Sequence, residues 1–155
     1  MSQTSYSMSM VTAKKGMLAD NGPKDIISRT NPDAAMAHGR LAVLGDSDEV
    51  CAVPAVTGDV SAKALGIVIA DLSNLDSTAV EAKKPMSLLR KGRIWVYSEQ
   101  AVGPSDTVFV RFGAGGNAGD FRKDADTDKA VALPTAKFVT TVAAAGLVQV
   151  EINLA

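Results

Sequence analysis

Few residues in this chain are of the types that carry out covalent or acid–base catalysis. The sequence holds one histidine, His38, and one cysteine, Cys51. A serine or cysteine nucleophile needs a neighbouring base, most often histidine, and with so little material a triad is not predicted. A serine–lysine pair is the one arrangement that spacing alone leaves open. We therefore expect no enzyme, with His38 in a structural role and Cys51 as a small buried apolar residue.

A glycine-rich segment at residues 113–119, GAGGNAG, is the first place that resembles a ligand-binding loop. It follows an expected strand, as a phosphate-binding loop does. However, no Gly-Lys-Ser or Gly-Lys-Thr sequence comes after it, and the following residues do not begin a convincing helix. A dinucleotide site would also require a βαβ unit, which the pattern does not offer. We expect a surface loop and no cofactor.

Three alternating aspartates, Asp124, Asp126 and Asp128, form the second such segment. An EF-hand loop requires glycine at its sixth position and glutamate at its twelfth, and these positions hold Lys129 and Thr135. We expect an acidic turn that is balanced by nearby basic side chains, and no bound metal. A looser calcium or magnesium site is the alternative.

The composition is that of a globular protein without a preference for polyanions. The 155 residues are most simply one folded unit, and 46% of them are hydrophobic. With 16 basic and 17 acidic residues the formal charge is −1, which argues against binding to nucleic acid or to an anionic membrane surface. A single cysteine excludes an internal disulfide, which is typical of synthesis in a reducing cytoplasm. No pattern of a signal peptide is present at the start of the sequence.

The first 30 residues are poorer in aromatic residues than the remainder. We therefore expect an extended N-terminal arm (1–30) and a β-rich body (31–155). In the arm, Tyr6, Met8 and Met10 alternate with serines and are followed by Val11, which is typical of a strand with one apolar face. A lone strand is unstable. We therefore expect these four residues to contact a neighbouring chain.

The body reads as a series of short strands separated by turns, with one short helix at its start. Asn31 can cap a helix, Pro32 suits its first position and Gly39 can end it. The expected strands, with Arg90-Lys91-Gly92 as a turn between two of them, are Leu41–Leu44, Val50–Val53, Ala64–Leu72, Met86–Leu89, Arg93–Ser98, Thr107–Phe112, Lys137–Val142 and Leu147–Leu154. Such a pattern indicates an antiparallel β-sandwich or barrel, jelly-roll-like in type.

Two of these strands supply candidate contact residues. Trp95 and Tyr97 occupy one face of their strand, opposite Ile94 and Val96. In the last strand, apolar residues that include Val148 and Val150 alternate with polar ones, which is typical of a half-buried strand. We expect Trp95, Tyr97, Val148 and Val150 near a subunit interface. Stacking of Trp95 and Tyr97 on a sugar is the alternative.

Three segments together make the body similar to the capsid cement, or decoration, proteins of tailed bacteriophages. In order, they are 64–69 (ALGIVI), 90–97 (RKGRIWVY) continued by 102–111 (VGPSDTVFVR), and 119–122 (GDFR) continued by Asp126, Ala130, Ala136–Phe138 and 146–152 (GLVQVEI). Each segment alone is unspecific, and their order and spacing over about residues 39 to 154 carry the resemblance.

The resemblance implies a structural virion protein without catalytic residues. It would be made in the host cytoplasm, bind the outer surface of the phage head and clamp adjacent major capsid subunits. We expect self-association, with a homotrimer favoured and a dimer as the alternative, because capsid lattices offer both symmetries. A receptor- or carbohydrate-binding module of the virion surface is the alternative function.

Overall fold

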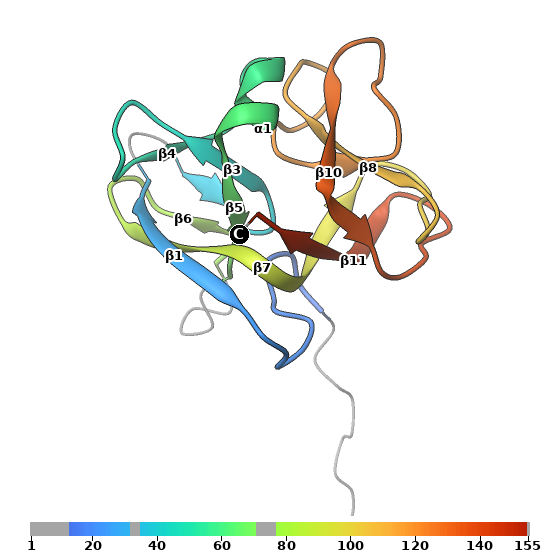
Figure 1. Cartoon of the computed structure of the whole chain (residues 1–155), viewed down its shortest axis with the longest axis horizontal. Coiled ribbons are helices and arrows are strands. Elements are labelled where there is room, and N and C mark those ends of the chain that lie inside the picture. The colour runs from blue at the N-terminus through green and yellow to red at the C-terminus, as the bar shows by residue number, and fades with distance from the viewer. Residues whose placement is uncertain (1–12, 32–34, 71–76, 155) are drawn as a thin grey trace, which may run out of the picture.

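The computed structural model describes residues 13–31, 35–70 and 77–154. The expected arm contacts Tyr6, Met8, Met10 and Val11 lie outside these residues. Within them, strands dominate and one short helix is present (Figure 1). The elements are β1 (Asp25–Thr30), β2 (Met36–Ala37), β3 (Leu41–Leu44), β4 (Cys51–Ala52), α1 (Thr57–Lys63), β5 (Ala64–Val68), β6 (Ala79–Val80), β7 (Pro85–Ser98), β8 (Thr107–Arg111), β9 (Phe121–Arg122), β10 (Ala130–Phe138) and β11 (Gly146–Asn153).

Five strands close into a small barrel. The order β7–β11–β10–β8–β9 returns to β7 through a single parallel pairing of Ser98 with Phe121, and the other pairings are antiparallel. Closure leaves these strands few free edges. The interior is filled by alternate residues of each strand, among them Val148, Val150 and Ile152, which are completely buried. The predicted fold class, mainly β with a barrel- or sandwich-like sheet, is confirmed.

Strand β7 is longer than expected and belongs to two parts of the sheet. The turn predicted at Arg90-Lys91-Gly92 is wrong, because β7 runs unbroken through these residues. Its first half pairs with β1, from Pro85 to Lys91, and its second half pairs with β11, from Lys91 to Ser98. Gly92 has a φ of 135°, a conformation that glycine adopts at little cost and that allows the strand to change direction between its partners.

Beyond the first half of β7 the sheet continues through β5, β3 and β4. The predicted hairpin is present: Val43 pairs with Ala52, and Leu44 with Cys51. Strand β5 is buried on both faces, as its apolar run predicted. Ile67 contributes to the barrel core, and Val68 to a second cluster on the opposite face that includes Met36, Cys51, Met86 and Leu88.

The helix is not where the sequence predicted it. The expected helix at residues 31–39 is contradicted by β2, since Met36 and Ala37 pair with Val80 and Ala79. The Asn31 side chain, expected to cap a helix, donates to the carbonyls of Val80 and Glu81. Two helical turns are marginally stable alone, so these longer-range hydrogen bonds prevail.

The observed helix, α1, follows β4. The Asp59 side chain accepts hydrogen bonds from the backbone N–H groups of Ala55 (2.9 Å) and Val56 (3.2 Å), which secures the first turn. Val60 is its one fully buried apolar side chain.

The described part of the expected arm lies on β7 of its own chain. Leu18 pairs with Ile94, and β1 pairs with residues 85–91, so residues 16–30 run antiparallel to nearly all of β7, with an excursion at 20–24. The expected boundary at residue 30 therefore falls inside the sheet that the body forms.

We predict that Gly66→Ala destabilises the fold by about 1–3 kcal/mol, the usual range for overpacking. A Cβ atom at Gly66 would lie 2.7 Å from the Leu89 carbonyl oxygen of the neighbouring strand β7. Gly58→Ala is the matched control, because a Cβ atom there meets nothing within 4 Å and alanine is favoured over glycine in a helix. Denaturant unfolding should show opposite changes for the two variants, and equal stability of both would contradict this packing.

Candidate assembly surfaces

The outer face of the barrel presents a partly exposed apolar strip, which we call the aromatic strip after Trp95 and Tyr97. Trp95 and Tyr97 of β7 are half-buried there, while Ile94 and Val96 point into the core, as the alternation predicted. On β11, Gln149 pairs with Trp95, and Leu147 with Tyr97, so these side chains share the outer face. A strip of this kind, with rings that are neither buried nor fully solvated, is suited to packing against another surface.

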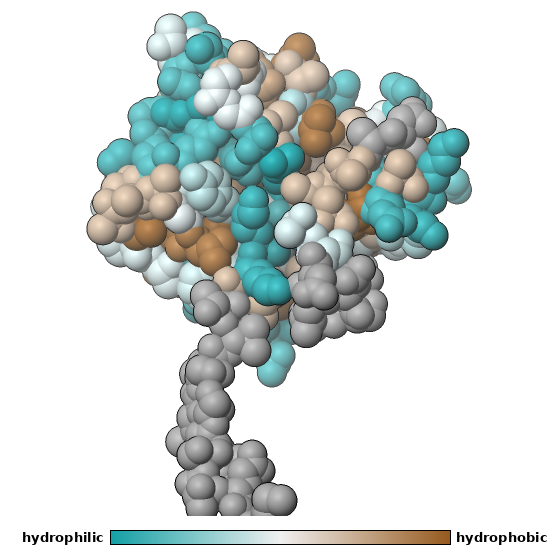
Figure 2. Space-filling model, turned by 180° about the vertical axis from the view of Figure 1, so that it is seen from behind, coloured by the Kyte–Doolittle hydropathy of each residue, from teal (hydrophilic) through white to brown (hydrophobic). Residues whose placement is uncertain are grey.

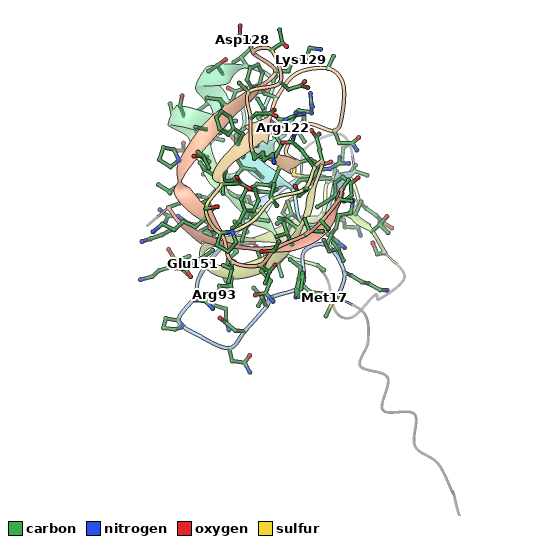
Figure 3. All side chains as sticks on the ribbon, turned by 90° about the vertical axis from the view of Figure 1, so that its right-hand side faces the viewer. Met17, Arg93, Arg122, Asp128, Lys129 and Glu151 are labelled. Atoms are coloured by element: carbon green, nitrogen blue, oxygen red, sulfur yellow. The ribbon has the colours of Figure 1, made fainter. Side chains whose placement is uncertain are left out.

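Charged residues border this strip on one side. The Arg93 Nε donates to Glu151 Oε2 over 2.9 Å, and Asp20 lies 3.7 Å from the same nitrogen. Lys137 pairs with Glu151 from the neighbouring strand β10 and adds a further charge. Figure 3 shows Arg93 and Glu151 close together near Met17, at the end of the molecule opposite to Arg122, Asp128 and Lys129.

The two valines of β11 are not part of this surface. Val148 and Val150 have no exposed area, because both side chains point into the barrel core. The predicted alternation of apolar and polar residues in β11 is confirmed, and its apolar face is the one that lines the barrel core. They have no surface left for a partner subunit, and the interface prediction now depends on Trp95 and Tyr97.

Lys15 and Gly16, where the N-terminal arm joins the body, lie beside the aromatic strip. The Gly16 N–H donates to the Trp95 carbonyl over 2.7 Å, and the Gly16 carbonyl accepts from the Ala70 N–H over 2.8 Å. The Lys15 ammonium lies 5.4 Å from the centre of the Tyr97 ring, within range of a cation–π interaction. We call these contacts the arm root.

Two glycines allow the backbone at the arm root to pack closely against the body. Gly16 has a φ of 83° and Gly39 one of 77°. A Cβ atom at Gly16 would lie 2.8 Å from the Ala70 nitrogen, and one at Gly39 would lie 2.9 Å from the Gly16 nitrogen. Side chains are therefore excluded from both positions, and the direction in which the arm leaves is fixed by the fold.

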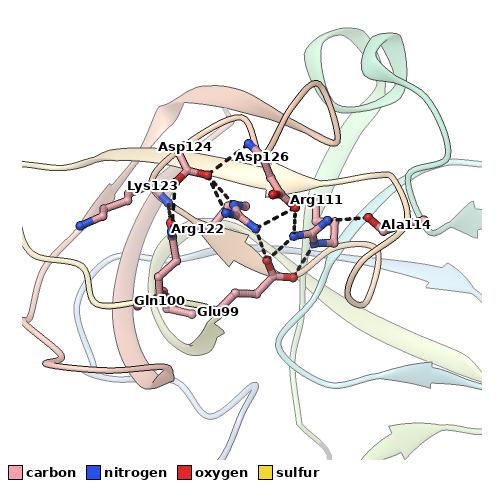
Figure 4. Close-up of polar contacts among 9 residues, drawn as sticks. Glu99, Gln100, Arg111, Ala114, Arg122, Lys123, Asp124 and Asp126 are labelled. Carbon is pink, nitrogen blue, oxygen red and sulfur yellow. Dashed lines mark hydrogen bonds and ion pairs between the residues drawn. The ribbon is translucent and has the colours of Figure 1, made fainter.

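At the other end of the molecule, two arginines and three carboxylates form a cluster that we call the arginine cluster (Figure 4). Arg111 is 2% exposed and donates to both oxygens of Glu99, at 2.6 and 2.8 Å, and to Asp126 at 2.6 Å. Arg122 donates to Glu99 at 2.8 Å and to Asp124 at 2.6–2.9 Å. Every charge in the cluster thus has an opposite charge in contact, as burial requires.

The arginine cluster holds the two loops that had resembled ligand sites. Arg111 Nη1 donates to the Ala114 carbonyl over 2.9 Å, which fastens the glycine-rich loop. Asp126, Thr127 and Asp128 all have positive φ values, and contacts to Asp126 from both arginines hold this strained turn.

The arrangement does not resemble a metal site. Within residues 13–31, 35–70 and 77–154, no group of three or more histidine, cysteine or acidic side chains is placed to hold a metal ion. Asp124 and Asp126 face arginines, whose positive charges would repel a cation. In the same ranges, no helix is long and apolar enough to cross a membrane.

The histidine and the cysteine lie inside the fold. His38 is 3% exposed, in the turn that follows β2, and not at the end of a helix as predicted. Cys51 is completely buried, as predicted, and burial raises the pKa of its thiol. A buried thiol with a raised pKa is a poor nucleophile.

Some residues that shape these surfaces were missed from the sequence. Glu99 and Arg111 were not predicted to interact, because Glu99 directly follows β7 and Arg111 ends β8, and a single sequence does not show that these positions are neighbours. A charged residue at the end of the apolar strand Thr107–Arg111 was the one available signal.

We predict that Glu99→Gln lowers the free energy of unfolding by about 3 kcal/mol, because it removes the less exposed of the two carboxylates that both buried guanidinium groups contact. The matched control is Glu151→Gln, which breaks the exposed pair with Arg93 and should cost no more than about 1 kcal/mol. Chemical denaturation measures both, and equal losses would show that the arginine cluster is not a stabilising element.

The arginine cluster should also make stability depend on pH in the acid range. Hydrogen bonding from Arg111 lowers the pKa of Asp126, and hydrogen bonding from Gln100 lowers that of Asp124. A carboxylate with a lowered pKa stabilises the fold above its ordinary value, 3.8, and this contribution is lost as the pH falls below it. We expect the denaturant concentration at the unfolding midpoint to decrease as the pH is lowered below about 4. The decrease should be smaller in Asp126→Asn. Identical slopes would contradict the assignment.

The back of the molecule, seen in Figure 2, shows small hydrophobic patches separated by hydrophilic residues. Patches of this size are ordinary on a protein surface and do not by themselves indicate a partner. The aromatic strip and the arm root therefore remain the strongest candidates for contact with other chains.

Comparisons with known proteins agree with an assembly role. A family model described as "Structural cement protein (E217 gp24/Pam3 gp6)" matches residues 2–153. A chain from the capsid of the Myoviridae phage XM1 has a similar fold, with a TM-score of 0.69 and 17% identity over 90% of this chain and 89% of that one.

The N-terminal base of the phage phi29 head fibre gp8.5 has a TM-score of 0.48 and 10% identity over 86% of this chain and 97% of that one, which is too weak to argue from. No curated protein sequence matches the chain. A family match over nearly the whole length, together with the barrel fold, is sufficient to identify the class: the chain belongs to the structural cement proteins of phages, as a structural component of the virion capsid.

Proposed function

We propose that the chain binds the outer surface of the phage head and clamps adjacent major capsid subunits to one another. The observation that carries this proposal is the position of the arm root beside the aromatic strip of Trp95 and Tyr97. A rigid body would rest on the capsid while the arm reaches a neighbouring chain, either capsid protein or a sister subunit. Many weak contacts, repeated over a lattice, give a firm attachment without a single tight site.

The body supplies the rigid part of this clamp. Closed strand pairing in the barrel and the charged contacts of the arginine cluster fix its shape. Residues 1–12 of the arm are proposed to supply reach, since twelve extended residues span about 40 Å. Tyr6, Met8, Met10 and Val11 are its proposed anchors, and methionine side chains adapt well to irregular grooves.

We further propose that the protein acts as a homo-oligomer, a trimer in preference to a dimer, without enzymatic activity and without nucleic acid or membrane as a partner. Trp95 and Tyr97 are the proposed subunit-contact residues. A near-neutral net charge of −1 and the intermixed charges around the strip support this choice of partner.

Heads assembled with and without the protein test the proposal. We expect heads that lack it to open at a lower temperature, and heads carrying a Trp95→Ser/Tyr97→Ser variant to retain less of the protein, at least tenfold by quantitative gel analysis. Val56→Ser is the control, because Val56 is 58% exposed at the start of α1. Heads that open at the same temperature with and without the protein would refute the clamp.

A further inference from the structure

We infer that the outer edge of β1 receives residues 5–11 of a neighbouring copy as an added strand. The inference rests on the proposed function and deepens it, because it names the partner of the arm as a second copy of this chain. Figure 1 shows β1 as the outermost strand on its side of the sheet, with β7 as its neighbour.

The backbone groups of β1 that point away from β7 can be identified from its last residue. The Thr30 N–H donates to the Glu49 carbonyl over 2.8 Å, and so points away from Pro85, its partner on β7, which has no N–H to exchange. Because backbone direction alternates along an antiparallel strand, Ser28 and Ile26 point the same way. Among the described residues, no hydrogen bond outside the β1–β7 ladder satisfies the N–H of either one.

The Arg29 side chain provides a second sign of an unfilled edge. Its Nη1 folds back to donate to the Ser28 carbonyl over 2.7 Å, at the position where the N–H of an added strand would otherwise donate. Its Nε is buried and has no hydrogen-bond partner among the described residues. A buried donor without an acceptor is costly, and a carbonyl oxygen of an incoming strand would satisfy it.

The side chains of β1 also favour pairing with a further strand, because they leave an apolar residue exposed at the edge. Ile26 is 45% exposed, one of three large hydrophobic residues in the described ranges that are so exposed. Free edges are usually protected by charge, proline or a covering segment. Ile26 and Ser28 share the outward face, and Ile27 packs on the second core cluster.

The proposed occupant matches this edge in length and in chemistry. Residues 5–11, SYSMSMV, carry no charge and alternate apolar with small polar side chains. Laid beside β1, such a segment adds backbone hydrogen bonds and covers an apolar residue on one face, which is the usual mode of strand addition. Its seven residues are sufficient for Asp25 to Arg29, the part of β1 that the contact of Thr30 with Glu49 and Val50 leaves open.

The arm of the same copy is badly placed to fill this edge. The pairing of Leu18 with Ile94 places Lys15 at the level of Tyr97, whereas β1 begins at Asp25, opposite Lys91. These levels are six residues apart along β7, about 20 Å at 3.3 Å per residue. Four residues, from Lys15 back to Val11, span at most about 14 Å. The arm therefore fits the edge of another copy better than its own.

This contact joins two different surfaces, an arm and an edge, so each copy can give one arm and receive another. Such heterologous contacts close into rings when the rotation between copies allows it. An arm-to-edge ring is consistent with the trimer proposed above.

Sedimentation velocity over a range of concentrations tests the inference. The variants are Ser28→Pro, which removes one outward N–H without touching the ladder to β7, and Ile26→Lys, which places a charge on the edge. The third is a chain of residues 13–155, which keeps the described members of both core clusters, since these lie between residues 18 and 154. Val56→Lys is the matched control at an exposed valine far from β1 in the sequence. Circular dichroism establishes that each is folded.

We expect the wild-type protein and Val56→Lys to associate equally, and each of the three edge or arm variants to associate at least tenfold more weakly. A mixture of the 13–155 chain with Ser28→Pro or Ile26→Lys should form a one-to-one complex and nothing larger, since one partner offers an edge and the other an arm. Undiminished association of the 13–155 chain, a mixture that stays monomeric, or a wild-type protein that is monomeric at every concentration would overturn the inference.

Occupancy of the same variants on phage heads separates this inference from the proposed function. Ring contacts that are intact in solution, with no protein bound to heads, would refute the cement role and leave the arm-to-edge contact standing. Normal heads decorated by a protein that never self-associates would do the reverse.

Discussion

The hydrogen-bonding requirement of β7 is the constraint on which the rest of this structure depends. Fourteen residues of extended chain present donors and acceptors on both sides, and nearly all of them must be satisfied when buried. The fold meets this requirement with several partners in turn: β1 and β5 on the first half, β11 and residues 16–19 on the second. The barrel and the sheet extension share this strand, so neither can form without it.

In the arginine cluster, buried charged side chains are satisfied by one another and not by a backbone ladder. Apolar side chains of similar size could stabilise the region equally well, because desolvation of charges offsets much of their attraction. What charges add is direction: the Arg111 guanidinium reaches Glu99, Asp126 and the Ala114 carbonyl at once. It therefore fixes the relative position of two irregular loops that contribute little to the apolar core, and the outline of that end of the molecule is set.

Local patterns in the sequence predicted much of the fold, and long-range pairings account for the failures. Alternation correctly identified Ile94 and Val96 as core residues, because strand periodicity is a property of the chain itself. The turn at Gly92 and the helix at 31–39 were wrong, because β1, β11 and β6 supply backbone partners there that no local pattern reveals. The same reason explains why Trp95 and Tyr97 could be proposed for a surface while Glu99 and Arg111 were overlooked.

The direction in which the arm leaves the body has a mechanical consequence. Residues 16–19 lie antiparallel to β7, and the chain before them continues toward Tyr97, along the axis of that strand. Tension on the arm would thus act parallel to the strands and load their hydrogen bonds together, in shear. A pull across the sheet would instead open them one after another, like a zipper. A load applied along the arm would therefore be shared by the hydrogen bonds of the whole ladder, which suits the clamp proposed above.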